Sequence, residues 1–265
     1  MYQKHWGLKK LPFENTPDTE FFFESEQHEE AFSRLSYVID ERKACGVITG
    51  PYGTGKTLIL KALERQFKKK GYVFSFVQNP RLDDLGLLKI ILHNFTGYNV
   101  PKAKEDVLMG IERFLRDTVQ DGKHVVVAID EAQLINDESV FEELRLLLNF
   151  QTETRFMLTL LLSGQPELKE KLDANKQFSQ RVTLSYHLKA LDFEETRKYV
   201  QHRLEVAGLG ANIFDEKAME LLYERSGGIP RWINNIANLS MLAAYSKGEK
   251  TITGELVAEG VESSR

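Results

Sequence analysis

The chain has 265 residues, 42% of them hydrophobic and 28% charged, which suits a globular protein with one large domain or two smaller ones. Its 35 Lys and Arg residues are outnumbered by 39 Asp and Glu residues, and the net charge of −4 argues against a generally basic nucleic-acid binder. The single cysteine, Cys45, excludes an internal disulfide framework, and no apolar run is long enough to cross a bilayer. We therefore expect a cytoplasmic protein that does not itself insert into a membrane.

The first 25 residues form an aromatic-rich arm, and a helical pattern follows it. The arm contains Leu11-Pro12-Phe13 and the run Phe21-Phe22-Phe23, and Pro12 argues against a long helix there. From residue 25 to about residue 43, apolar residues recur at helical spacing. We expect the arm to lie on the domain that follows it.

A phosphate-loop motif comes next and organises the rest of the chain. The pattern G-x-x-x-x-G-K-[ST] is matched at every fixed position by Gly50, Pro51, Tyr52, Gly53, Thr54, Gly55, Lys56 and Thr57. Residues 44–49 predict a buried strand and residues 58–70 a helix, which is the context this motif requires. Loop N–H groups and the positive helix end would face the phosphates, Lys56 would reach the β- and γ-phosphates, and the Thr57 hydroxyl would ligate Mg²⁺. The sequence therefore predicts a nucleoside triphosphate site. Part of the aromatic arm would cover the adenine of the bound nucleotide.

Strands and helices then alternate to about residue 190. Strands are predicted at 72–77, 124–129, 156–162 and 182–188, and helices at 82–95, 104–119 and 138–150. From Asp192 onward only helical patterns remain, with near-capping-box chemistry at 192–195, a cap at Asp215 and a first-turn Pro230. The predicted fold class is α/β, a P-loop NTPase with a central parallel sheet flanked by helices (1–190, including the arm 1–25), followed by an all-helical lid domain (191–265).

Two carboxylates, Asp130 and Glu131, follow the most hydrophobic of the predicted strands. An apolar strand ending in Asp-Glu is a weak signal by itself, with a surface turn as the alternative, but a phosphate loop upstream strengthens it. Asp130 would hold Mg²⁺ directly or through water, and Glu131 would orient and deprotonate the attacking water. Because a nucleotide switch can lack such a base, Glu131 indicates hydrolysis.

A strand and helices between the two motifs (residues 72–119) give the topology of the additional-strand (ASCE) ATPases, which include the AAA+ proteins. Where AAA+ proteins place a sensor of the γ-phosphate, this sequence has Gln165 or, as the second choice, Ser163; an ordinary turn before a helix is the alternative. Arg181 precedes the last strand, where the arginine finger of a neighbouring subunit would come from. A surface ion pair is the alternative for Arg181.

The chain resembles the AAA+ ATPases of the ExeA type, typified by general secretion pathway protein A, over nearly its whole length. The resemblance is carried, in one order, by residues 2–13, the phosphate loop, Ile129-Asp130-Glu131-Ala132-Gln133, Gly164-Gln165-Pro166-Glu167-Leu168, Gln180-Arg181-Val182 and Gly228-Ile229-Pro230-Arg231. It implies ATP as the nucleotide and Arg231 as a second sensor that contacts the γ-phosphate from the lid. By itself, Arg231 is only an arginine in the first turn of a helix.

The same resemblance implies an Mg²⁺-dependent homo-oligomer, such as a hexamer, that drives assembly or remodelling of a secretion, pilus or exopolysaccharide complex of the envelope. The founding members continue into a membrane segment and a peptidoglycan-binding region, whereas this sequence stops at Arg265. We therefore expect no peptidoglycan contact, and recruitment to the inner membrane only through a partner. The alternative is an ATP-dependent, DNA-binding transposition regulator of the TniB/TnsC type, which the acidic net charge makes the less favoured hypothesis.

Overall fold

The computed structural model describes residues 2–16, 18–97 and 100–263. Contacts between Cα atoms divide the chain into two compact units. We call residues 29–50 and 59–188 the sheet unit, and residues 1–28, 51–58 and 189–265 the lid unit. The predicted domain boundary at residue 190 remains a prediction, but the division shows that the arm and most of the phosphate loop pack with the C-terminal helices.

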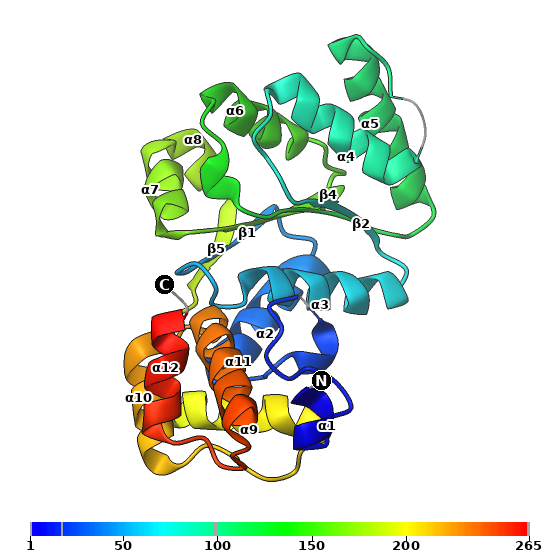
Figure 1. The fold of residues 1–265 in the computed structure, drawn as a ribbon. Coiled ribbons are helices and arrows are strands. Elements are labelled where there is room, and N and C mark those ends of the chain that lie inside the picture. Colours follow the sequence, from blue (N-terminus) through cyan, green and yellow to red (C-terminus); the bar gives the residue numbers. More distant parts are fainter. Residues whose placement is uncertain (1, 17, 98–99, 264–265) are drawn as a thin grey trace. The chain divides into compact units, whose positions relative to one another are not determined.

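The sheet unit is built on five parallel strands in the order β2-β3-β4-β1-β5 (Figure 1). These are β1 (Cys45–Thr49), β2 (Val73–Val77), β3 (Val125–Ile129), β4 (Leu158–Gly164) and β5 (Val182–His187). β4 lies between the strand that precedes the phosphate loop and the strand that precedes Asp130, which confirms the additional-strand topology. All five predicted strands form, and β4 runs two residues further than predicted, so that it includes Ser163.

Helices cover both faces of this sheet (Figure 1). One face carries α2 (Glu26–Asp40) and α3 (Lys56–Lys69), and the other carries α4 (Asp84–Thr96), α5 (Lys104–Gln120), α6 (Glu138–Leu147), α7 (Pro166–Ala174) and α8 (Lys176–Ser179). Burial on both faces explains why every residue of β1, β3 and β4 is buried, whereas burial alternates along the edge strand β5. The helical periodicity does not predict α7 and α8, which fill the stretch between β4 and β5.

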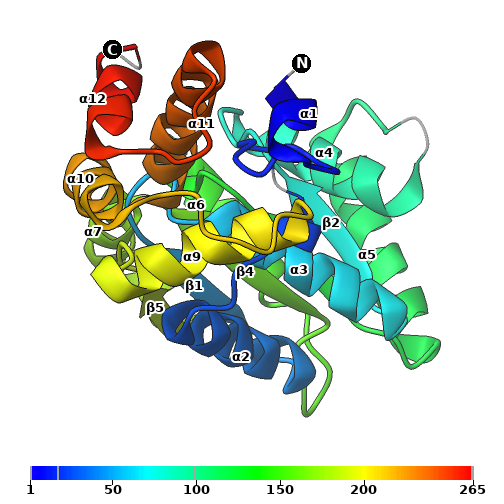
Figure 2. The same cartoon turned by 60° about the horizontal axis from the view of Figure 1, so that its bottom comes forward.

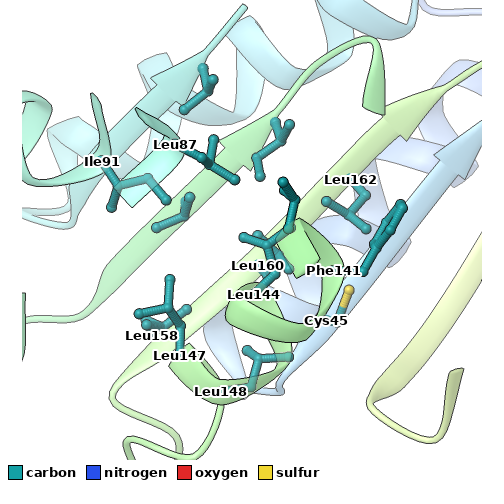
Figure 3. Close-up of a cluster of buried hydrophobic side chains, with 14 of the residues drawn as sticks. Cys45, Leu87, Ile91, Phe141, Leu144, Leu147, Leu148, Leu158, Leu160 and Leu162 are labelled. Carbon is teal, nitrogen blue, oxygen red and sulfur yellow. The ribbon is translucent and has the colours of Figure 1, made fainter. Parts of the chain in front are cut away.

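The core under α4 to α8 is a continuous cluster of aliphatic side chains (Figure 3). Leu87 and Ile91 of α4 and Leu144 of α6 pack over Leu160 of β4 and Cys45 of β1. Burial raises the pKa of the Cys45 thiol well above its usual value, so Cys45 acts as a small apolar residue here.

The lid unit contains α9 (Phe193–Val206), α10 (Glu216–Ser226), α11 (Pro230–Lys247) and α12 (Gly254–Ser263), together with α1 (Tyr2–Trp6) and the 3₁₀ turn η1 (Thr19–Phe21) of the arm (Figure 2). The predicted caps form: Asp192 and Glu195 make a full capping box, and the Asp215 carboxylate accepts from Ala218 N–H. Trp6 and Phe13 of the arm enter the helical core. Over the described residues, none of the helices has the length and apolarity needed to traverse a bilayer.

Candidate active site

The phosphate loop leaves the sheet unit at Gly50 and continues in the lid unit from Pro51. Gly50 N–H donates to the Gly164 carbonyl at the end of β4 over 3.2 Å, and a Cβ at position 50 would lie 2.3 Å from the Leu188 carbonyl oxygen. Only glycine fits such a close backbone approach. Lys56 is 5% exposed and its ammonium donates to the Pro51 carbonyl over 2.8 Å, so it lies folded over its own loop.

The first turn of α11 contacts the loop through Arg231. Arg231 N–H donates to the Gly53 carbonyl over 3.3 Å, and its guanidinium lies 4.2 Å from the centre of the Tyr52 ring and donates to the Tyr52 hydroxyl. A Cβ at Gly53, whose φ is +87°, would lie 2.7 Å from Arg231 Cβ. The structure thus brings the predicted lid sensor onto the predicted phosphate loop.

A buried histidine anchors the other side of the loop. His28 Nε2 lies 2.9 Å from the Thr54 carbonyl oxygen, and Nδ1 lies 2.7 Å from Ser25 Oγ. Because a carbonyl only accepts, Nε2 carries the proton and Nδ1 accepts from the serine hydroxyl. Burial lowers the pKa of His28 below 6.5, against a smaller opposing effect of the Thr54 bond, so the ring is held neutral.

The aromatic arm forms a small pocket beside the loop. Its lining comprises Phe21, Phe22, Phe23, His28, Thr54, Gly55, Leu58, Tyr199, Arg203 and Pro230. The buried guanidinium of Arg203 fixes the arm, because it lies 4.5 Å from the centre of the Phe21 ring and donates to the Pro12 and Glu14 carbonyls over 2.5 and 2.8 Å.

In the sheet unit, Asp130 follows the last residue of β3 and is 5% exposed. Its Oδ1 accepts from Ser163 Oγ over 2.7 Å and from Glu131 N–H over 3.0 Å. Ser163 is fully buried, so its hydroxyl is committed to orienting this carboxylate. Gln165, the other sensor candidate, is partly exposed at the N-cap of α7.

Glu131 has a left-handed backbone, with φ at 53° and ψ at 36°. For a residue with a Cβ this conformation costs on the order of 1–3 kcal/mol, and such strain is concentrated at functional sites. Its carboxylate accepts from Gln133 Nε2 over 2.5 Å. The turn therefore fixes both the backbone and the side chain of the predicted base.

Arg181 lies at the other end of the sheet. Val182, which follows it, pairs with Cys45, the first residue of β1, whereas Asp130 and Ser163 stand at carboxyl ends of strands. The Arg181 guanidinium donates to Asn149 Oδ1 over 2.8 Å. The structure does not bring Arg181 to the carboxylates of its own subunit.

Sequence reasoning gave no role to His28, Gln133 or Lys171. Gln133 is part of the quoted motif Ile129–Gln133, but its contacts depend on where the chain returns after β4. His28 has no motif, and only its place after the aromatic run marks it. Lys171 Nζ donates to the carbonyls of Gln133 and Ile135 over 2.5 and 2.7 Å, a role that no spacing rule would predict.

Known proteins resemble this chain in sequence and in fold. A family model described as AAA domain matches residues 39–172, about half of the chain. General secretion pathway protein A of Aeromonas hydrophila is 35% identical over 271 residues, which cover 100% of this chain and 49% of that protein. The chain thus spans about half the length of this curated relative.

Solved structures of low identity share the fold. The Aeropyrum pernix ORC2 protein in ADPNP–ADP complexes superposes with a TM-score of 0.67 at 18% identity, covering 89% of this chain and 67% of that one. Cdc6p from Pyrobaculum aerophilum gives 0.68 at 16% identity, with 89% and 68% covered. The Thermotoga maritima RuvB Holliday junction branch migration motor gives 0.60 at 16% identity, with 96% and 73% covered.

Proposed function

The chain belongs to the AAA domain family of P-loop ATPases, and from this we propose that it binds ATP with Mg²⁺ at its phosphate loop and hydrolyses the γ-phosphate bond with Glu131 as general base. One observation carries the proposal: β1, β3 and β4 deliver Gly50, Asp130 and Ser163 to one edge of the parallel sheet. In open α/β sheets, ligands bind outside the carboxyl ends of the strands.

The residues present fit Mg²⁺ and a triphosphate. Mg²⁺ takes one or two protein oxygens plus phosphates and water, and we propose that the Thr57 hydroxyl and the Asp130 carboxylate would supply the protein oxygens. Lys56 and the N–H groups of the loop would bind the β- and γ-phosphates, and Arg231 would reach the γ-phosphate from α11. Gln165 would hold the γ-phosphate or the attacking water, while Ser163 orients Asp130.

The adenine would enter the aromatic pocket beside the loop. The pocket is lined by Phe21, Phe22 and Phe23 together with Thr54 and Gly55 of the phosphate loop, so a nucleotide whose phosphates lie on the loop has its base within reach of these rings. Stacking on aromatic faces does not by itself choose between purines, and the choice of ATP over GTP rests on the family.

Arg181 would act on the nucleotide of a neighbouring subunit. Its place at the amino end of β5 keeps it from the carboxylates of its own chain, so a catalytic role needs a second copy in contact. A guanidinium supplied in this way stabilises charge in the phosphoryl-transfer transition state. The active form would then be a homo-oligomer, with a hexamer as the first expectation.

The curated relative is named for general secretion. We therefore assign this chain to the assembly or remodelling of an envelope complex, with ATP turnover driving the change. DNA remains the alternative partner, because one structure with the same fold is described as the Aeropyrum pernix ORC1 protein in complex with DNA. At 17% identity that likeness shows the fold alone.

The first experiment measures phosphate release from Mg²⁺-ATP by the wild type and by Glu131→Gln. We expect steady turnover in the wild type and tight ATP binding without turnover in the variant, since a carboxamide cannot accept the proton. Wild-type turnover in Glu131→Gln would remove the base assignment. No hydrolysis by wild type at any concentration, including those at which it oligomerises, would contradict the proposed function.

The second experiment is the solution mass of Glu131→Gln with Mg²⁺-ATP, with and without double-stranded DNA. A closed oligomer of fixed mass that ignores DNA supports the envelope role. An oligomer whose mass grows only when DNA is present would contradict the envelope role and support the DNA-binding regulator. A monomer in both conditions would contradict the trans role of Arg181.

A further inference from the structure

The side chain of Gln133 joins two segments that the proposed hydrolysis needs in fixed places. Its Nε2 donates to Glu131 Oε2 over 2.5 Å, and its Oε1 accepts from Gln165 N–H over 3.1 Å. Gln133 is 9% exposed, so loss of either partner would leave a nearly buried polar atom unpaired. The Glu131 carboxylate can only accept and the Gln165 N–H can only donate. These two partners therefore determine which terminal atom of the Gln133 side chain is Nε2 and which is Oε1.

The backbone at the end of β4 is shaped to allow this bridge. A Cβ at Gly164 would lie 2.7 Å from Gln133 Oε1 and 2.8 Å from Leu168 Cδ2. Any other residue would push the amide oxygen away from Gln165 N–H. Gly164 therefore permits the close approach that connects the end of β4 to the turn carrying Glu131.

A second anchor holds the same turn by its main chain. Gln133 lies in the 3₁₀ turn η2 (Ala132–Leu134), and the Lys171 ammonium of α7 donates to the Gln133 and Ile135 carbonyls and, over 3.1 Å, to Asn136 Oδ1. Thus α7 contacts the turn at two points. The Gln165 N–H at the N-cap of α7 donates to the Gln133 side chain, and Lys171, further along the helix, donates to the main chain of the turn.

We propose that Gln133 is a positioning residue that holds the Glu131 carboxylate in its working orientation and couples that orientation to the segment 163–165 at the end of β4. This inference rests on the proposed hydrolysis. A glutamate side chain has three rotatable bonds, and a donor at one carboxylate oxygen restricts them before the water arrives, which is the preorganisation that general-base catalysis needs. A shift of the γ-phosphate sensor segment would reach the base through this amide.

The test uses the isosteric variant Gln133→Glu in the full chain. Glutamate keeps an acceptor for Gln165 N–H but replaces the donor to Glu131 by a negatively charged oxygen, so the attraction at that arm of the bridge becomes a repulsion. We expect kcat to fall by about 10- to 100-fold, the usual loss for residues that support a catalytic group, with the ATP Kd within about twofold of wild type. Gln151→Glu, at an exposed position of the same unit, is the matched control for charge.

Two further variants separate positioning from a general structural effect. In a Glu131→Gln background, Gln133→Glu should lower the residual rate no further, because the carboxylate it acts through is already lost. Gln165→Pro and Gln165→Ala both remove the side chain, but only proline removes the N–H, and the φ of −75° at this position already suits proline. We expect a lower kcat for Gln165→Pro than for Gln165→Ala, with melting temperatures checking that both fold.

The outcomes distinguish the inference from the proposed function. Wild-type hydrolysis, a stalled Glu131→Gln and a normal kcat for folded Gln133→Glu would overturn the inference alone. An equal further loss from Gln133→Glu with and without Glu131 would also overturn it, because the effect would then not pass through the base. Absence of hydrolysis in the wild type would overturn both.

Discussion

The phosphate loop and the carboxylates are held by different kinds of contact in the two units. In the lid unit, the loop is bound mainly through its backbone. The main-chain N–H of Arg231 donates to the Gly53 carbonyl, and Nε2 of His28 donates to the Thr54 carbonyl. In the sheet unit, Asp130 and Glu131 are held by the side chains of Ser163 and Gln133. Backbone anchoring tolerates changes of side chain, whereas a side-chain network is lost when one member changes.

This difference predicts that nucleotide binding and hydrolysis depend on different units. Side chains that face the phosphates from the lid unit should control affinity, and those of the sheet unit should control turnover once the nucleotide is bound.

Lys56→Ala and Glu131→Gln should fail in opposite ways, with the largest effects. Lys56→Ala leaves the phosphate charge without its cation and should not bind ATP detectably, whereas Glu131→Gln should bind as wild type and lose up to about 10⁴-fold in kcat, the upper range for a general base. Equilibrium binding of a fluorescent ATP analogue and phosphate release measure the two separately. Lys56→Ala binding as tightly as wild type would break the division.

Arg181 and Arg231 should differ in whether a second subunit can replace them. Arg181→Ala should bind ATP normally and lose about 10³-fold in kcat, the lower range for an arginine finger. Mixing it with Lys56→Ala should restore activity, because the lysine variant supplies Arg181 to intact loops. Arg231→Ala should weaken ATP binding, and mixing should not rescue it, since Arg231 contacts the loop of its own chain.

The mixing experiment decides whether each arginine acts on the nucleotide of its own subunit or on that of a neighbouring subunit. Rescue of Arg231→Ala would mean that lids are exchanged between copies. Failure to rescue Arg181→Ala in mixtures shown by mass to form mixed oligomers would leave Arg181 with its structural role at Asn149. Arg116→Ala, on an exposed face of α5, serves as the control variant.

Much of the candidate site could be predicted from the sequence, because each of its two main motifs is formed by residues that are neighbours in the chain. The phosphate loop and Asp130-Glu131 occupy a few consecutive residues each, and a strand buried on both faces has an unmistakable composition. The bridge made by Gln133 was not predictable, since one of its two contacts joins residues 32 apart and its partner there is a backbone N–H. His28 was missed for the same reason: it bonds a carbonyl, which leaves no trace in side-chain patterns.

Acid should destabilise the sheet unit through His124. Burial, aided by Arg42, lowers the pKa of His124 to about 3, and its Nδ1 has no partner among the described residues. The unfolded chain, with an ordinary histidine pKa near 6.5, binds the proton first, so stability is complete above pH 6.5 and falls as the pH drops towards 3. At pH 5 the loss from this residue is about 2 kcal/mol, from 1.36 kcal/mol per pH unit.

Urea unfolding at pH 7.5 and at pH 5 measures this effect. His124→Gln should flatten the dependence of the unfolding free energy on pH. His28 should add a separate effect of the same sign in the lid unit, because burial lowers its pKa too. An unchanged pH dependence in His124→Gln would show that the acid sensitivity does not come from His124.

Tyr52 should give the smallest effect, confined to binding. Its ring is 50% exposed and lies under the Arg231 guanidinium, a contact worth about 0.5–1 kcal/mol at exposed sites. Tyr52→Ala should therefore weaken ATP binding about two- to fivefold, leave kcat unchanged and lose its effect in an Arg231→Ala background; Tyr37→Ala, equally exposed on α2, controls for the loss of a ring. Tighter binding by Tyr52→Ala would mean that the tyrosine competes with the phosphates for Arg231, so that the lid sensor must leave its contact on the loop before it can reach the nucleotide.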